Sequence, residues 1–142
     1  GVESELEFLS NNMNGVAMKN ISPSEKILEL IATHLDAIKM TVYRNGTLRA
    51  NIFRDIWRVE AMRKNFDQNE IKLFRTVLKE GKEDGVFGID DIDITADILH
   101  YCIKGIEVPY IRGQIGEELD DATGWRYVAN IVYGALGCRN NE

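Results

Sequence analysis

The sequence predicts an all-α fold, a bundle of about six helices in one domain. Apolar residues recur every three or four positions along most of the 142-residue chain, which is the spacing of amphipathic helices. Only two prolines occur, fewer than a turn-rich all-β chain needs, and the length is that of a single domain. A hydrophobic content of 44% can supply a core, and 28% charged residues give a solvated surface.

The first two helices are predicted from a stripe and a capping sequence. Within residues 3–19 the apolar positions are spaced alternately four and three apart, and nothing caps the start, as in a helix cut from a longer one. The second helix opens at Ser22, with Pro23 at its first position and Glu25 completing a capping box. Asn45, with the glycine after it, should end this helix in the left-handed cap conformation.

The middle of the chain predicts a third and a fourth helix with a break between them. A stripe begins at Leu48, and its pattern stops near Asn65. Asp67 is then expected to cap a fourth helix, with Glu70 at its third position. Gly85 is the expected residue just past the end of that helix.

Two further helices complete the chain. Asp90 and Asp91 should open the fifth, because acidic groups suit the positive end of the helix dipole. Pro109 should kink or end that helix. A polar stretch over 113–121 leads to a last helix at about 121–136, which holds Trp125.

The last two helices are apolar around most of their circumference, whereas a helix on the outside of a domain should be amphipathic. A chain this short has little protein to cover two such helices. We therefore expect the same pair of a second copy to cover them, which gives a four-helix interface about a twofold axis. The simpler alternative is that both helices are central. The expected interface residues are Ile98, Cys102, Gly105, Val128, Ile131, Val132 and Ala135.

The charge pattern disfavours direct binding to nucleic acid. The net charge is −6, whereas a nucleic-acid-binding domain normally carries a basic face. The densest group of basic residues lies within 44–64, where acidic residues interrupt it, so it indicates a solvated face. No apolar run approaches the length of a membrane span, and the N-terminus has no basic segment of a signal peptide. We expect a cytoplasmic protein with no membrane partner and with two free cysteines.

No pattern of catalytic, metal-binding or cofactor-binding residues is present. The chain has only two histidines, so a site with several histidine ligands is excluded. Asp97 and His100 form one imperfect copy of the Glu-x-x-His pair that di-iron bundles use twice. The simpler interpretation is a buried or half-buried His100 with Asp97 as its local partner. We expect no catalytic residue, no metal and no cofactor.

One group of large side chains is suggestive of a ligand pocket. Aromatic residues and methionines on the second, third and fourth helices can form an adaptable apolar pocket, although they can equally form a plain core. Because no cluster of arginine or lysine accompanies them, the expected ligand is small and apolar or aromatic. His34, His100 and Tyr101 could add polar contacts. The wall residues are Met40, Tyr43, Phe53, Trp57, Met62 and Phe74.

The whole chain resembles the C-terminal ligand-binding and dimerisation domain of TetR/AcrR-type bacterial transcription regulators. The strongest match lies within 77–87, where a Glu-Gly pair is followed after three residues by glycine and then phenylalanine. The helix start and the run over 96–106 continue the match. The resemblance implies a homodimer that binds a small effector. It also implies that operator DNA is contacted only through an N-terminal helix-turn-helix domain missing from this chain, with residues 3–19 as the connecting helix. Ligand residues cannot be carried over, because the family's pockets vary.

The interpretation that follows is a single sensor and dimerisation domain over residues 1–142. Ligand binding among the second to fifth helices would move the connecting helix and change the spacing of two DNA-reading heads. The first alternative is a helical protein–protein interaction module with a solid core and no ligand. The second is a small helical enzyme, against which the lack of convergent polar residues counts.

Overall fold

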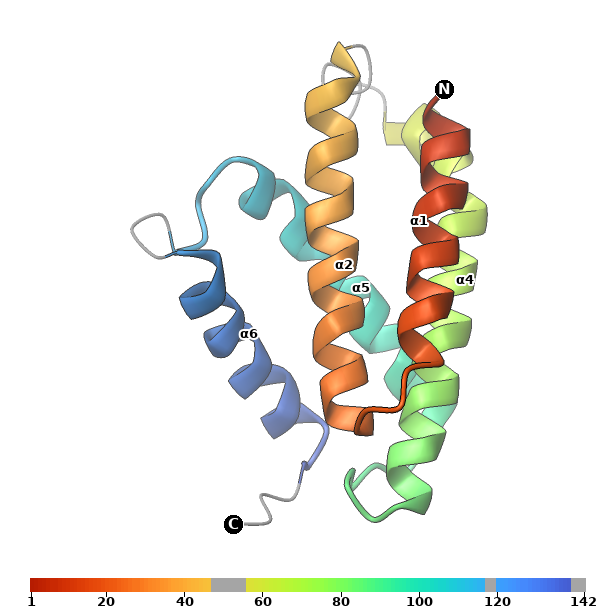
Figure 1. Ribbon diagram of the computed structural model, residues 1–142, viewed down its shortest axis with the longest axis vertical. Helices are drawn as coiled ribbons and strands as arrows, with labels where there is room; N and C mark the ends of the chain where they lie inside the picture. Colours follow the sequence, from red (N-terminus) through yellow and green to blue (C-terminus); the bar gives the residue numbers. More distant parts are fainter. Residues whose placement is uncertain (47–55, 117–119, 139–142) are drawn as a thin grey trace.

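A computed structural model describes residues 1–46, 56–116 and 120–138 of the chain, and within these ranges it contains five helices and no strand (Figure 1). The all-α prediction is confirmed, whereas the described residues form five helices in place of about six. The helices are α1 (Val2–Ala17), α2 (Pro23–Arg44), α4 (Ile56–Glu83), α5 (Ile92–Ile111) and α6 (Asp121–Ala135).

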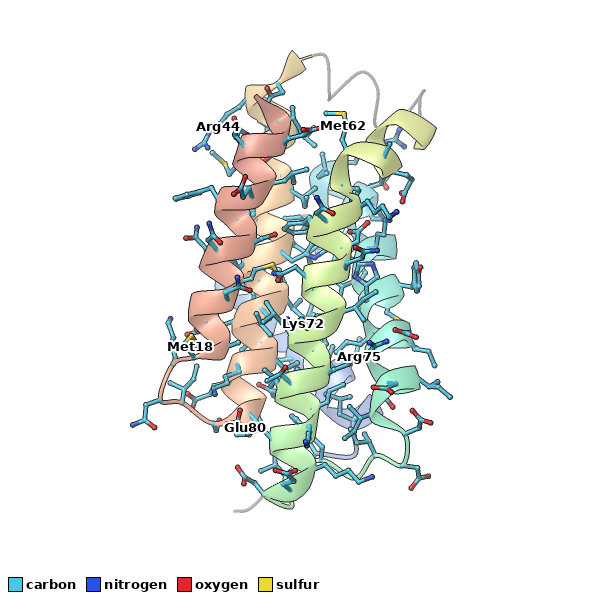
Figure 2. The ribbon with its side chains drawn as sticks, turned by 90° about the vertical axis from the view of Figure 1, so that its right-hand side faces the viewer. Met18, Arg44, Met62, Lys72, Arg75 and Glu80 are labelled. Carbon is cyan, nitrogen blue, oxygen red and sulfur yellow. The ribbon has the colours of Figure 1, made fainter. Side chains whose placement is uncertain are left out.

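Helix α2 is the centre of the arrangement. It contacts each of the other four described helices, while α1 also packs on α4 and α4 also packs on α5. Figure 1 shows α5 passing behind α2, and α6 lying on the side of α2 away from α1. In the view of Figure 2, side chains fill the space between α1, α2 and α4. A displacement of α2 would therefore change the packing of every other described helix.

The limits of α2 follow from its sequence, although one capping mechanism differs from the prediction. Ser22 accepts a hydrogen bond from the Glu25 N–H at 3.2 Å, and Pro23 is the first helical residue, as expected. The helix ends at Arg44, before Asn45. Asn45 has an extended backbone with φ −118°, and its side-chain amide donates to the Thr41 carbonyl at 2.9 Å. The expected left-handed cap was wrong: from an extended backbone, both the N–H and the side-chain amide of Asn45 donate to the Thr41 carbonyl.

Helix α4 is continuous, so the predicted break near Asn65 was wrong. Asp67 and Glu70, the expected cap residues of a separate helix, are instead buried in its middle. Phe66 and Phe74 lie on the same buried side. The hydrophobic pattern was interrupted because polar residues occupy positions in the core, where they bind charged groups of other helices. The beginning of the third predicted helix lies outside the described residues.

The end of α4 is closed by two glycines with different roles. Gly85 adopts φ +74°, a conformation that glycine reaches at little cost, and its N–H donates to the Lys82 carbonyl at 3.1 Å. The Val86 N–H donates to the Gly81 carbonyl at 2.8 Å, which completes a Schellman cap. A Cβ at Gly81 would lie 2.2 Å from the Phe87 ring. Gly81 therefore allows Phe87 to pack directly on the helix backbone.

Helix α5 begins at a side-chain cap and contains a proline near its end. Asp91 caps α5 by accepting from the Ile94 N–H at 2.9 Å, as predicted. Pro109 lies inside α5, which ends two residues later at Ile111. None of the described helices is both long and apolar enough to cross a membrane.

The C-terminal end of α6 is joined to the connection between α4 and α5. The Gly88 N–H is directed at the carbonyls of Leu136 and Gly137, at 3.0 and 3.2 Å. Gly137 has φ +60°, and a Cβ on it would lie 3.0 Å from the Gly88 carbonyl oxygen. The two backbones thus meet without intervening side chains, at a contact that only glycine at 137 permits.

Candidate functional site

A groove of about 710 Å³ runs between α5 and α6. None of its lining residues carries a formal charge at neutral pH, and most of them are aliphatic. Monomeric proteins rarely leave a large continuous apolar surface open to water. The lining residues are Thr95, Ile98, Leu99, Cys102, Ile103, Ile106, Ile115, Gly116, Gly124, Tyr127, Val128, Ile131, Val132, Ala135 and Leu136.

The rim of the groove consists of large side chains that face solvent. Ile98 of α5 is 59% exposed, and on α6 Tyr127 is 55% and Ile131 74% exposed. Val132 and Leu136 are buried beneath them. Isolated exposed apolar residues are common on protein surfaces, but three of them around one uncharged groove indicate a surface suited to binding another molecule.

The structure brings together six of the seven residues predicted for an interface between copies. Gly105 is exposed on α5 and is not among the lining residues. The interface itself stays a prediction. The six that line the groove are Ile98, Cys102, Val128, Ile131, Val132 and Ala135.

The residues predicted to bind an effector are placed differently from one another. Phe74 and His100 are fully buried in the core, whereas Met40, Tyr43 and Tyr101 are exposed. The Tyr43 hydroxyl donates to the Ile111 carbonyl at 3.4 Å. Phe53 lies outside the described residues, as does the side chain of Trp57, whose backbone belongs to α4. The pocket stays a prediction.

A second feature was not predicted, namely a cluster of charged side chains buried between α2, α4 and α5. At its centre lies His34 of α2, which is fully buried. Its Nδ1 contacts a carboxylate oxygen of Glu70 on α4, and its Nε2 contacts a carboxylate oxygen of Glu107 on α5. One imidazole thus joins three helices. We call the residues His34, Arg63, Asp67, Glu70, His100, Lys104 and Glu107 the buried ionic network.

Arg63 supplies the main cation of this network from α4. Its two terminal nitrogens donate to the two oxygens of Glu107 at 2.6 and 2.7 Å, in the bidentate geometry that suits a carboxylate. Its Nε donates to Asp67, one turn along the same helix, at 3.1 Å. Asp67 also accepts from the Lys104 ammonium at 2.9 Å, and Glu60 accepts from the same group at 2.6 Å. The pairs continue without a gap from α4 to α5.

His100 belongs to this network, and its predicted pairing with Asp97 was wrong. Its Nδ1 lies 2.8 Å from an oxygen of Glu70, so Glu70 serves both histidines. Asp97 lies instead at the surface, 3.3 Å from Arg75, which projects from α4 toward α5 (Figure 2). Within the part of the chain that the structure describes, every buried side-chain nitrogen and oxygen has a hydrogen-bond partner.

The contacts in the network shift several pKa values in the directions expected for ion pairs. Burial by itself lowers the pKa of His34, but Glu70 and Glu107 outweigh it and raise that pKa to about 9. Burial opposes ionisation of Glu107, yet Arg63 and His34 lower its pKa to about 2. The pKa of Glu70 is lowered as well, by the two histidines acting against burial. These groups are therefore charged at neutral pH.

The network is chemically saturated, which limits what it can do. Its carboxylates are occupied by the side chains of the protein, and among the described residues no group of three or more His, Cys, Asp or Glu is arranged to hold a metal ion. The sequence did contain an indication of it. Glu70 lies four residues from both Phe66 and Phe74, and Glu107 lies four residues from both Ile103 and Ile111, so each occupies a position within an apolar stripe.

Comparisons with models of known protein families, with curated proteins and with solved structures gave no match.

Proposed function

We propose that this chain is the effector-binding and dimerisation domain of a bacterial transcription regulator of the TetR/AcrR type. In this proposal, binding of a small apolar or aromatic effector changes the DNA affinity of the full-length protein. The observation that carries it is the uncharged groove between α5 and α6, which is open to solvent in a single copy.

A second copy of the chain is the cover that fits the groove best. Burying an exposed aliphatic or aromatic side chain contributes about 1.5–3 kcal/mol, and the rim offers Ile98, Tyr127 and Ile131 in each copy. Interfaces of homodimers are more apolar than other protein surfaces and are depleted of charge. A twofold axis brings the same uncharged groove of both copies together, so neither copy has to bury an unpaired charge.

The dimensions of the two helices agree with such an interface. Helix α5 has 20 residues, which corresponds to a length of roughly 30 Å. Helix α6 has 15 residues, and the groove residues extend along both helices, from Thr95 to Ile106 and from Gly124 to Leu136. Four helices of this length form a bundle of ordinary size.

The position of α1 supports a role in passing on a signal. In the family that the chain resembles, the DNA-binding domain precedes this helix. Helix α1 packs on both α2 and α4, so a shift of either helix changes the support of α1. Because the two heads of such a dimer must match operator half-sites about 34 Å apart, a small rotation of α1 is enough to weaken binding. The proposed effector residues stay those predicted from the sequence, namely Met40, Tyr43, Phe53, Trp57 and Phe74; the side chains of Phe53 and Trp57 lie outside the described residues.

The alternative function is a helical protein–protein interaction module without a ligand. The burial of Phe74 and His100 in the core favours it, because two of the expected effector residues are already covered by the protein itself. A thermal-shift screen with small hydrophobic compounds separates the two functions. An effector present at a hundredfold excess over its Kd should stabilise the domain by about 2.7 kcal/mol, and Trp57→Ala should abolish the shift.

Sedimentation equilibrium tests the dimer directly. The unmodified chain should be dimeric at roughly 100 μM, well above a micromolar Kd. Ile131→Asp should give a folded monomer, because it puts a charge on the rim of the apolar groove, where a second copy would cover it. The matched control is Phe8→Asp, at a residue of α1 that is 64% exposed and does not line the groove; it should remain dimeric. A monomeric unmodified chain would refute the proposal.

A further inference from the structure

We infer that the junction of α2, α4 and α5 is a proton-dependent ionic lock, in which a doubly protonated His34 donates to Glu70 with one ring nitrogen and to Glu107 with the other. None of the residues of the lock lines the groove, and the lock does not depend on whether the chain dimerises.

The geometry around His34 requires two N–H donors. Each ring nitrogen faces a carboxylate oxygen, and an ionised carboxylate can only accept. A neutral imidazole has one N–H, so its other nitrogen would direct a lone pair at a carboxylate oxygen inside the core. Only the imidazolium form, with a proton on each nitrogen, satisfies both contacts.

The alternative of a protonated carboxyl group conflicts with the other contacts. Both oxygens of Glu107 accept from the Arg63 guanidinium, at 2.6 and 2.7 Å, which holds that carboxyl group ionised. Glu70 places its second oxygen 2.8 Å from Nδ1 of His100. Arg63 holds Glu107 as an acceptor and the two histidines lower the pKa of Glu70, so the extra proton belongs on His34.

A proton on His34 brings the buried cations and carboxylates of the network into balance. The groups facing it come from α4 (Arg63, Asp67 and Glu70) and from α5 (His100, Lys104 and Glu107), with Glu60 at the half-exposed rim beside Lys104. Three cations, namely His34, Arg63 and Lys104, then face three buried carboxylates. A neutral His34 would leave an excess of negative charge in the core, which is costly where water cannot reach it.

Because of where His34 lies, its protonation state affects the stability of the whole helix bundle. Helix α2 contacts every other described helix, and His34 links it to both α4 and α5, beside the separate ion pair of Lys26 with Glu80 on α4. The stabilisation from a raised pKa is fully present below the unfolded value of 6.5 and is lost as the pH rises to about 9. Between these limits each pH unit should lower the folding equilibrium constant by about tenfold. The lock therefore weakens across the range from neutral to mildly alkaline pH.

Nitrogen NMR of the two histidine rings tests the protonation state in the intact chain. With His34→Gln used for assignment, both ring nitrogens of His34 should be protonated at pH 7.5. A neutral His34 ring at that pH would overturn the inference. The ring signals of the unmodified protein can also be assigned by through-bond correlation with the backbone. The measurement is therefore possible even if His34→Gln fails to fold.

Urea unfolding between pH 6 and 9.5 tests the link to stability. The folding equilibrium constant of the unmodified chain should fall about tenfold per pH unit above 6.5, and His34→Gln should remove that dependence. His100→Gln is the matched control, since it changes the other buried histidine of the same network and should keep the dependence. An equal pH dependence in the unmodified chain and His34→Gln, or its loss in His100→Gln, would refute the lock.

Discussion

Replacing Glu107 by glutamine removes one charge from the buried ionic network without changing the size of the side chain. Glu107 is 3% exposed and accepts from Arg63 and His34, so two buried cations lose their common partner. Arg63 keeps Asp67, and His34 keeps Glu70. Breaking a buried ion pair by removing one partner typically costs about 3–5 kcal/mol. Because small domains have only about 5–15 kcal/mol of total stability, a large part of it should be lost.

Urea unfolding followed by circular dichroism measures this loss, and the melting temperature should fall by roughly 10–20 °C. The matched control is Asp97→Asn, which neutralises a carboxylate on the same helix. Asp97 pairs with Arg75 at the surface, where both side chains are about half exposed, so its loss should cost about 0–1 kcal/mol. If Glu107→Gln stays within about 1 kcal/mol of the unmodified chain, the network does not hold α4 and α5 together as described.

Two further predictions concern acid stability and the end of α4. The pKa of Glu107 is lowered to about 2, so the stability that its ionised form contributes is present above the unfolded pKa of 4.5. That stability should be lost as the pH falls from 4.5 to about 2. Urea midpoints measured across that range check this, and a flat profile would contradict it. Gly81→Ala should destabilise the domain by about 1–3 kcal/mol, since the new Cβ would meet the Phe87 ring at 2.2 Å. Gly15→Ala, where a Cβ meets nothing within 4 Å on α1, should instead stabilise by about 0.5–1 kcal/mol, and equal effects of the two substitutions would count against the packing described.

The features that could be predicted from the sequence depend on neighbouring residues. The cap of α2 at Ser22 and that of α5 at Asp91 were predicted correctly, because a cap is formed by residues three apart. The reversal at Gly85 was also expected, since its left-handed backbone is a local requirement. The uncharged faces of α5 and α6 were visible as apolar residues on more than one side of each predicted helix.

The pairs of the buried ionic network could not be predicted, because its contacts join residues far apart in the chain. His34 and Glu107 are 73 residues apart, and Arg63 and Glu107 are 44 apart. A charged residue within an apolar stripe indicates a break when the pattern is considered alone, and this produced the wrong division of α4 near Asn65. Only the fold shows that each such charge faces an opposite one.

The contact between Gly88 and Gly137 limits which substitutions this domain tolerates. It fixes α6 at its C-terminal end, where the backbone hydrogen bonds of 3.0 and 3.2 Å leave no room for a side chain at 137. The position of α6 along its axis is therefore fixed at that end. Substitutions at Gly137 should therefore be rare during evolution, because any side chain there would separate the end of α6 from the Gly88 backbone.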